Sequence, residues 1–152
     1  MNPAELAPRH QSEPLDVIVT GLPSDAHTWN LVYIQLLLED MGHRVVNLGS
    51  CVPQDEIIES CVTLRPDLLV VSSVNGHGGH DGRLLIEAVR SRWELAGLPA
   101  VIGGKLAVTD DGGRERALEL TRAGFDAVFQ DGVDFVSFAG FVGSVPARAV
   151  TR

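Results

Sequence analysis

Short apolar runs alternate with segments of helical periodicity along most of the chain, and this alternation limits the fold more than any other feature. The apolar runs of strand length are "LDVIVTGL", "HRVVNLG", "LLVVSSV", "PAVIGG" and "DAVFQ". The third run is almost continuously apolar, as is typical of a strand buried on both faces. Strands that alternate with helices favour right-handed crossovers and a parallel sheet with helices on both sides. We therefore predict an α/β fold with a doubly wound, five-stranded parallel sheet.

Segments between and after these runs predict the helices. The first extends from about Thr28 to Met41 and stops at Gly42, and the second lies between Pro53 and Pro66. Further helices are predicted over residues 83–96, 114–123 and 133–142. In the last, three phenylalanines recur at helical spacing and are expected to pack on the sheet. The aromatic residues expected in the core or at an interface are Trp93, Phe125, Phe135, Phe138 and Phe141.

The length of 152 residues suits one domain with a single sizeable core. Residues 1–14 and 144–152 mix proline, charge and small residues without periodicity, so we expect loose tails around a domain at 15–143. The net charge of −8 disfavours nucleic acid and anionic membrane surfaces as partners. No apolar run reaches the roughly 18–20 residues of a membrane span.

Two cysteines, Cys51 and Cys61, do not make a disulfide framework. We expect both to be small core residues. The N-terminus lacks the basic-then-apolar pattern of a secretory signal. A cytoplasmic location is the resulting expectation.

Hydroxyls, glycines and a histidine occupy the ends of three predicted strands. "SDAH" follows the first strand, "SSVNGHGG" ends and follows the third, and "GGKLAV" ends and follows the fourth. In such sheets, ligands bind beyond the carboxyl ends of the strands, where the strand order reverses. We therefore expect these segments to line one site.

Within the first segment, Asp25 and His27 are two positions apart, so their side chains point the same way on an extended or turning backbone. The carboxylate can then hold one imidazole nitrogen while the other faces outward. That arrangement orients a histidine for metal binding or proton transfer. Taken alone, the pair also fits a helix-capping aspartate beside an incidental histidine.

Other kinds of site find less support in the sequence. His77 and His80 could bind zinc with His27 or Cys51, but no second paired motif accompanies them, and a flexible loop is the simpler interpretation. "NGHGGHDG" lacks the Gly-Lys-Ser/Thr ending of a phosphate-binding loop, and no Gly-x-Gly-x-x-Gly follows the first strand. A phosphorelay receiver needs an aspartate after the third strand, where this chain has serines.

The three segments together resemble the cobalamin-binding domain of adenosylcobalamin-dependent mutases and methionine synthase, a flavodoxin-like or Rossmann-like domain. The signature of that family is Asp-x-His-x-x-Gly, then Ser-x-Leu, then Gly-Gly. The matching positions are Asp25, His27 and Asn30, then Ser72 and Val74, then Gly103 and Gly104. The resemblance extends over about 15–129. Its closest form is similar to the small subunit of glutamate mutase (methylaspartate mutase), whose "VSSLYGQG"-type stretch resembles "VSSVNGHG" here.

The resemblance implies that His27 is the lower axial ligand of cobalt and that Asp25 bonds its other ring nitrogen. It implies that Ser72 bonds the nucleotide tail of the cofactor in a slot between sheet and helix. Paired glycines suit such a slot because they have no side chain. The implied cofactor-binding residues are Ser24, Asp25, Ala26, His27, Thr28, Ser72, Ser73, Val74, Gly103, Gly104, Lys105, Leu106, Ala107, Val108 and Thr109. Asn30 stands where the family has glycine, and the bulky Trp29 precedes it in the turn that leaves room for the tail. Either the Asn30 amide bonds the tail, or the two side chains reduce the affinity for the cofactor.

The function implied is the cobalamin-binding subunit of an adenosylcobalamin-dependent mutase that converts glutamate to 3-methylaspartate. Apart from its cobalt ligand, this chain would carry no catalytic residue. A separate, barrel-type large subunit would hold the substrate, in a heterotetramer-like assembly, and this chain alone would be inactive. Two alternatives are a corrinoid carrier of methyl groups and a non-catalytic cobalamin sensor. A helical bundle usually precedes the domain in such carriers, and about 14 residues precede the first strand here.

Overall fold

The computed structural model describes residues 13–104, 113–130 and 135–147. They contain a sheet of the strands β1 (Asp16–Thr20), β2 (Arg44–Asn47), β3 (Leu68–Ser73), β4 (Ala100–Gly104) and β5 (Ala127–Gln130). The strands are parallel and lie in the order β2-β1-β3-β4-β5. This confirms the predicted doubly wound α/β fold.

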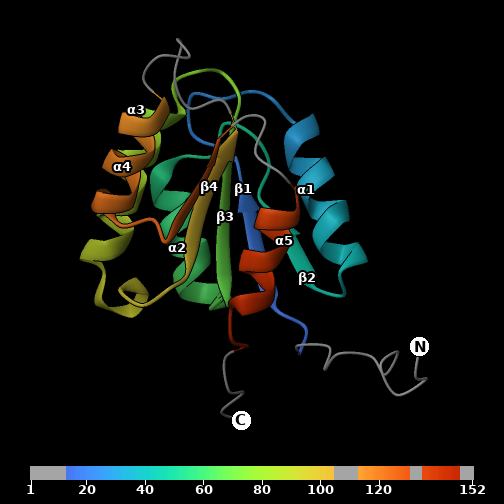
Figure 1. The fold of residues 1–152 in the computed structure, drawn as a ribbon. Coiled ribbons are helices and arrows are strands. Elements are labelled where there is room, and N and C mark those ends of the chain that lie inside the picture. Colours follow the sequence, from blue (N-terminus) through green and yellow to red (C-terminus); the bar gives the residue numbers. More distant parts are fainter. Residues whose placement is uncertain (1–12, 105–112, 131–134, 148–152) are drawn as a thin grey trace, which may run out of the picture.

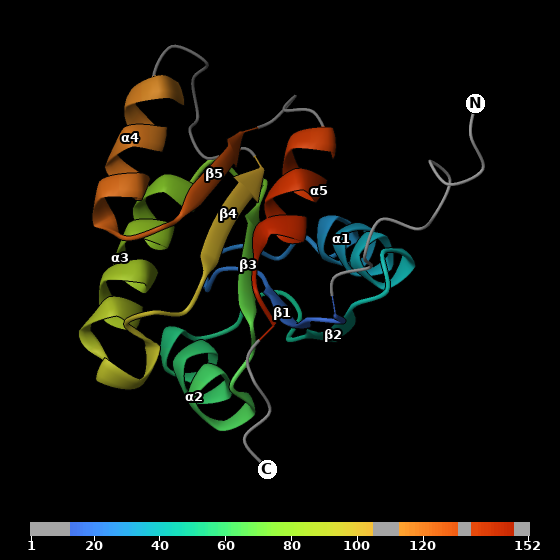
Figure 2. The ribbon, with the colours of Figure 1, turned by 60° about the horizontal axis from the view of Figure 1, so that its bottom comes forward.

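Helices cover both faces of the sheet (Figure 1). They are α1 (Trp29–Asp40), α2 (Gln54–Leu64), α3 (Gly78–Ser91), α4 (Gly113–Ala123) and α5 (Phe135–Ser144), with a short 3₁₀ helix η2 (Trp93–Leu95) after α3. Figure 2 shows α1 and α5 on one face and α2, α3 and α4 on the other. None of the helices in the described ranges is long and apolar enough to cross a membrane.

Alternate residues of the strands supply a separate apolar core on each face. Ile18, Leu69 and Ile102 pack with α2, α3 and α4, whereas Val17, Val70 and Val101 pack with α1 and α5. Every residue of β3 is buried, as its continuous apolar run predicts.

The strand order reverses between β1 and β3. The chain leaves β1 through α1 toward β2 at one edge, and leaves β3 through α3 toward β4 on the other side. The loops that follow β1 and β3 therefore meet at the carboxyl ends of the strands. This is the position at which open α/β sheets bind ligands.

Helix α3 begins at Gly78, five residues before the predicted start at Arg83, so the expected flexible loop is largely helical. The Asn75 side chain accepts a hydrogen bond from His77 N at 2.9 Å at the start of the helix. Gly82 lies against β4, where a Cβ atom would be 2.5 Å from Ile102 Cδ1. Gly82 thus allows close packing of the helix on the sheet, a role that periodicity does not reveal.

One predicted core residue, Cys51, is not in the core, and two of the aromatic residues predicted for the core or an interface are exposed. Cys51 is exposed in the loop after β2, and Trp93 is 84% exposed, whereas Cys61 and Phe125 are buried. Burial raises the pKa of the Cys61 thiol to about 11. Phe138 and Phe141 pack edge-on against Phe129, as predicted, but Phe135 at the start of α5 is 45% exposed.

Helix α5 continues to Ser144, and Val145 is buried against the core of α1 and α5. Most of the two predicted tails, residues 1–12 and 148–152, lies outside the described residues. The division into one domain with loose tails stays a prediction.

Substitution of Gly82 by alanine tests the close packing of α3. The added Cβ atom would clash with Ile102, so we expect the free energy of unfolding to fall by about 1–3 kcal/mol. Helix propensity alone predicts the opposite change, because alanine is favoured over glycine inside a helix by about 1 kcal/mol. Urea unfolding measures both effects. The control is Gly140→Ala in α5, where the added Cβ atom has open space, and its stability should equal or exceed that of the wild type. If Gly82→Ala were as stable as the wild type, the packing argument would be contradicted.

Candidate functional site

The carboxylate of Asp25 joins the two loops that meet at the switch point. Its Oδ1 atom accepts hydrogen bonds from His27 N (3.0 Å) and His27 Nδ1 (2.6 Å), within its own loop. Its Oδ2 atom accepts from Ser73 Oγ (2.9 Å) and Val74 N (2.8 Å), at the end of β3. The residue is 1% exposed, so one buried anion is bonded on both oxygens.

These hydrogen bonds decide the charge of Asp25. Burial by itself would raise the pKa of the carboxyl group, because it disfavours the ionised form. Donors from the backbones of His27 and Val74, and from the side chains of His27 and Ser73, outweigh that effect and lower the pKa to about 2. Asp25 is therefore ionised at neutral pH.

The imidazole of His27 contacts Asp25 through Nδ1 alone and is 59% exposed. A carboxylate favours the tautomer with the proton on Nδ1, which leaves the lone pair of Nε2 free. The spacing of the two residues predicts this contact, and the structure contains it. Within residues 13–104, 113–130 and 135–147, no three His, Cys, Asp or Glu side chains form a group that could hold a metal.

Two contacts that the sequence does not predict hold the loop of His27 against α3 and against the segment that precedes it. The Ser24 hydroxyl bonds to the carboxylate of Asp81, and Asn75 Nδ2 donates to Ser24 O at 3.0 Å. Of the other predicted residues in this loop, Ala26 and Thr28 are exposed beside His27. Asparagine is common in turns, where its side chain bonds nearby backbone, so Asn75 in "SVNG" carried a usable signal.

A cavity of about 310 Å³ lies between the sheet, α1 and α5. Four of the predicted site residues share its wall, namely Ser72, Val74, Gly103 and Gly104. Ser73 lies outside this wall, and its hydroxyl bonds Asp25 instead. The predicted residues Lys105–Thr109 lie outside the described residues. The wall is completed by Asn30, Tyr33, Ile34, Leu37, Val70, Val71, Val101, Ile102, Phe129, Gln130, Phe135 and Phe138.

Helical periodicity could have found part of this wall. Asn30, Tyr33, Ile34 and Leu37 have the i, i+3, i+4, i+7 spacing of one helix face.

The paired glycines are required by the sheet as well as by the cavity. Gly104 has φ +103°, and a Cβ atom there would lie 2.0 Å from Ser73 O. At Gly103 a Cβ atom would lie 3.0 Å from Phe129 O. Both positions therefore favour glycine before any ligand is considered.

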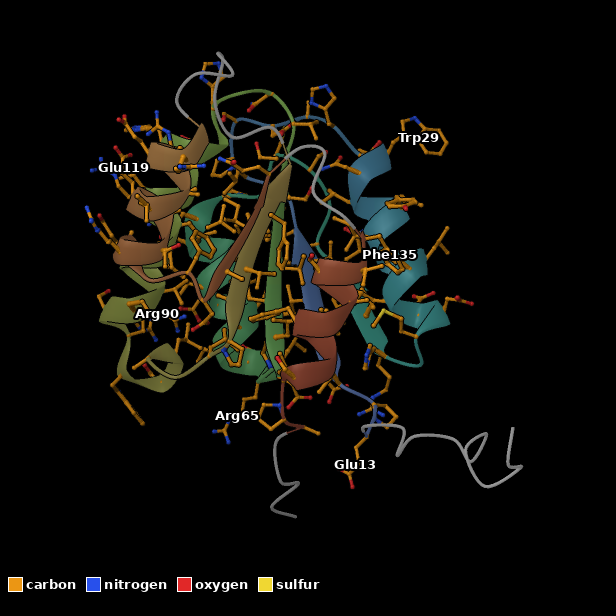
Figure 3. The ribbon with its side chains drawn as sticks, viewed as in Figure 1. Glu13, Trp29, Arg65, Arg90, Glu119 and Phe135 are labelled. Carbon is orange, nitrogen blue, oxygen red and sulfur yellow. The ribbon has the colours of Figure 1, made fainter. Side chains whose placement is uncertain are left out.

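The side chains of Trp29 and Asn30 lie on different sides of the start of α1, one in solvent and one in the cavity wall. Trp29 is 84% exposed and points outward from the start of α1, so the expectation that its bulk crowds the slot is wrong (Figure 3). Asn30 belongs to the cavity wall, and its Nδ2 atom donates to Ser72 Oγ at 2.8 Å. Its Oδ1 atom is buried and has no hydrogen-bond partner among the described residues.

Substitution of Asp25 by asparagine tests the buried anion. Each carboxylate oxygen accepts from two donors, and the NH₂ group of an amide cannot accept, so at least one backbone N–H, that of His27 or of Val74, is left unpaired. We expect a loss of about 1–3 kcal/mol in the free energy of unfolding at pH 7. The pKa of Asp25 is lowered in the folded state, so its stabilisation is complete above the ordinary value of 3.8 and is lost as the pH falls toward about 2.

The difference in urea unfolding between the wild type and Asp25→Asn should therefore shrink as the pH falls below 4. Asp40→Asn, at the exposed end of α1, is the matched control and should change stability little. A difference that is independent of pH between 7 and 3 would contradict the assignment.

Comparisons with known proteins identify the family of the chain. Residues 15–137 match the family model of the B12 binding domain. Glutamate mutase sigma subunit 1 of Haloarcula marismortui is 31% identical over 123 residues, which cover 80% of this chain and 79% of that protein.

Solved structures show the same fold at lower identity. A cobalamin-binding protein from Desulfitobacterium hafniense superposes with a TM-score of 0.65 at 18% identity, over 85% of this chain and 59% of that chain. A putative response regulator from Chloroflexus aurantiacus superposes with a TM-score of 0.64 at 18% identity, over 86% and 95%. These likenesses concern the fold alone, whereas the family match covers most of the sequence. The chain belongs to the B12-binding domain family.

Proposed function

We propose that this chain is the cobalamin-binding small subunit of an adenosylcobalamin-dependent carbon-skeleton mutase that converts glutamate to 3-methylaspartate. A separate, barrel-type large subunit holds the substrate, and this chain is inactive without it. The proposal includes a cytoplasmic, heterotetramer-like assembly. Its support is the family, the similarity to a glutamate mutase sigma subunit, and above all the pairing of His27 with the buried anion of Asp25.

The described residues fit cobalamin in two respects. The corrin ring supplies most of the cobalt ligands, so the protein needs to add one, and His27 is a single exposed imidazole with Nε2 free. The nucleotide tail needs a narrow apolar slot with a few polar groups, and the cavity beside α1 combines aromatic and aliphatic walls with two glycines, Ser72 and an unpaired Asn30 carbonyl.

Each residue would then have a defined task. His27 Nε2 would bind cobalt from below, while Asp25 holds the proton on Nδ1 and raises the basicity of the ring. Ser24, Ala26 and Thr28 would flank the corrin. Ser73 would keep Asp25 in place.

The tail slot is the second part of the proposal. Ser72 would bond the nucleotide tail, Val74 and the paired glycines would line it, and Lys105–Thr109 would wrap it. When bound, adenosylcobalamin supplies homolysis of its cobalt–carbon bond, which starts the radical rearrangement. This chain supplies ligation and placement, and the large subunit supplies the contacts to the substrate.

The visible spectrum of the protein with adenosylcobalamin tests the proposal. We expect the cofactor to bind with its own base displaced and a histidine in its place, and His27→Ala should abolish this spectrum and weaken binding. His80→Ala is the matched control, because His80 is an exposed histidine on α3 that is not among the hydrogen-bond donors to Asp25. A wild-type protein that retains no cobalamin, even with a large mutase subunit present, would show the proposal to be wrong.

A further inference from the structure

The cavity wall contains a residue, Asn30, with a buried carbonyl oxygen to which no described residue donates a hydrogen bond. Asn30 Oδ1 is inaccessible to solvent and has no partner among the described residues, although Nδ2 of the same amide donates to Ser72 Oγ at 2.8 Å. Buried polar groups are nearly always hydrogen-bonded, and an exception in a ligand-sized cavity points to an absent partner. That partner must be a donor, because the free atom is a carbonyl oxygen.

Ser72 carries a complementary free group. Its oxygen accepts from Asn30, and within the described ranges no acceptor is recorded for its own hydroxyl hydrogen. Ser72 is 3% exposed, so this donor also faces a dry environment. The two side chains therefore offer an acceptor and a donor close together on a mostly apolar wall.

The chemistry of the nucleotide tail narrows the choice of partner. Dimethylbenzimidazole carries neither an N–H nor an O–H group when alkylated by the ribose, and a phosphodiester at neutral pH has acceptors only. The donors are the ribose hydroxyl groups and the amide N–H of the linker that joins the phosphate to the corrin; cobinamide keeps that linker amide and lacks the ribose, so the two donors can be told apart. We infer that Asn30 Oδ1 accepts a hydrogen bond from a ribose hydroxyl of the cobalamin tail while the Ser72 hydroxyl donates to an acceptor of the same nucleotide, which makes Asn30 a specificity-determining residue of the slot.

The inference rests on the proposed function. The alternative is that Asn30 is a plug, meaning a side chain that only fills the slot and excludes the nucleotide. A plug would reduce the volume of the slot and would be best made of an apolar side chain. Asparagine instead leaves a carbonyl unpaired, at a cost that only a bound donor removes. Trp29, the bulkier neighbour, points away from the cavity and does not contribute to blockage.

The experiment compares two ligands with the same adenosyl group, adenosylcobalamin and adenosylcobinamide, which lacks the nucleotide. Dissociation constants are measured by equilibrium dialysis for the wild type, Asn30→Ala and Asn30→Leu. We expect both variants to bind adenosylcobalamin about tenfold more weakly, as for the loss of one neutral hydrogen bond, and adenosylcobinamide as the wild type does. Gln35→Ala, a polar-to-alanine change on α1 outside the cavity wall, should bind both ligands as the wild type does.

Two outcomes would overturn the inference. Unchanged or tighter binding of adenosylcobalamin by Asn30→Ala would identify Asn30 as a bystander or a plug. An equal loss for both ligands would show that Asn30 does not bind the nucleotide. Either result, obtained with a wild type that binds cobalamin through histidine, leaves the proposed function intact, whereas a wild type that binds neither ligand refutes the function itself.

Discussion

The buried carboxylate of Asp25 is the interaction on which the rest of the site depends. It accepts four hydrogen bonds, two from the loop after β1 and two from the end of β3, and so fixes the relative position of the two loops at the switch point. Because these donors keep it ionised, it can hold the proton of His27 on Nδ1. The exposed imidazole is thereby oriented by a group that is itself rigid.

The strand order of the sheet determines where the site lies, but it does not determine what the site binds. A putative response regulator shares the fold over nearly its whole length. The difference lies at the strand ends, where β3 finishes in Ser72 and Ser73 instead of the aspartate that a receiver needs. Ser73 donates a hydrogen bond to Asp25, whereas Ser72 lines the cavity, so the side chains of these adjacent residues lie on opposite faces of the sheet.

Most of the fold could be predicted because burial leaves a strong signal in the sequence. The continuous apolar run of β3 and the periodic apolar residues of α1 require the elements that they form. The start of α3 could not be predicted in the same way. Gly82 in this helix packs closely against Ile102, and that contact depends on tertiary packing, which local propensity does not contain.

The candidate site shows the same division. The spacing of two residues predicts the contact of Asp25 with His27. The position of Gly103 and Gly104 at the end of an apolar run predicts that they lie at the carboxyl end of a strand. The sequence marks Asn30 as a replacement for glycine whose amide can bond the tail, but it does not predict the pairing with Ser72, because that contact joins residues 42 positions apart. Cys51 was placed in the core on its residue type, although it lies in an exposed loop with φ 51°.

The central claim is that His27, oriented by Asp25, supplies the lower ligand of cobalt. Electron paramagnetic resonance of the cob(II)alamin-loaded protein tests it most directly, because the nitrogen bound to cobalt splits the signal according to its nuclear spin. Protein with ¹⁵N-labelled histidine should change the splitting from a triplet to a doublet, and His27→Ala should lose the doublet. A triplet that persists in the labelled protein would show that the nitrogen belongs to the cofactor's own base and would contradict the account.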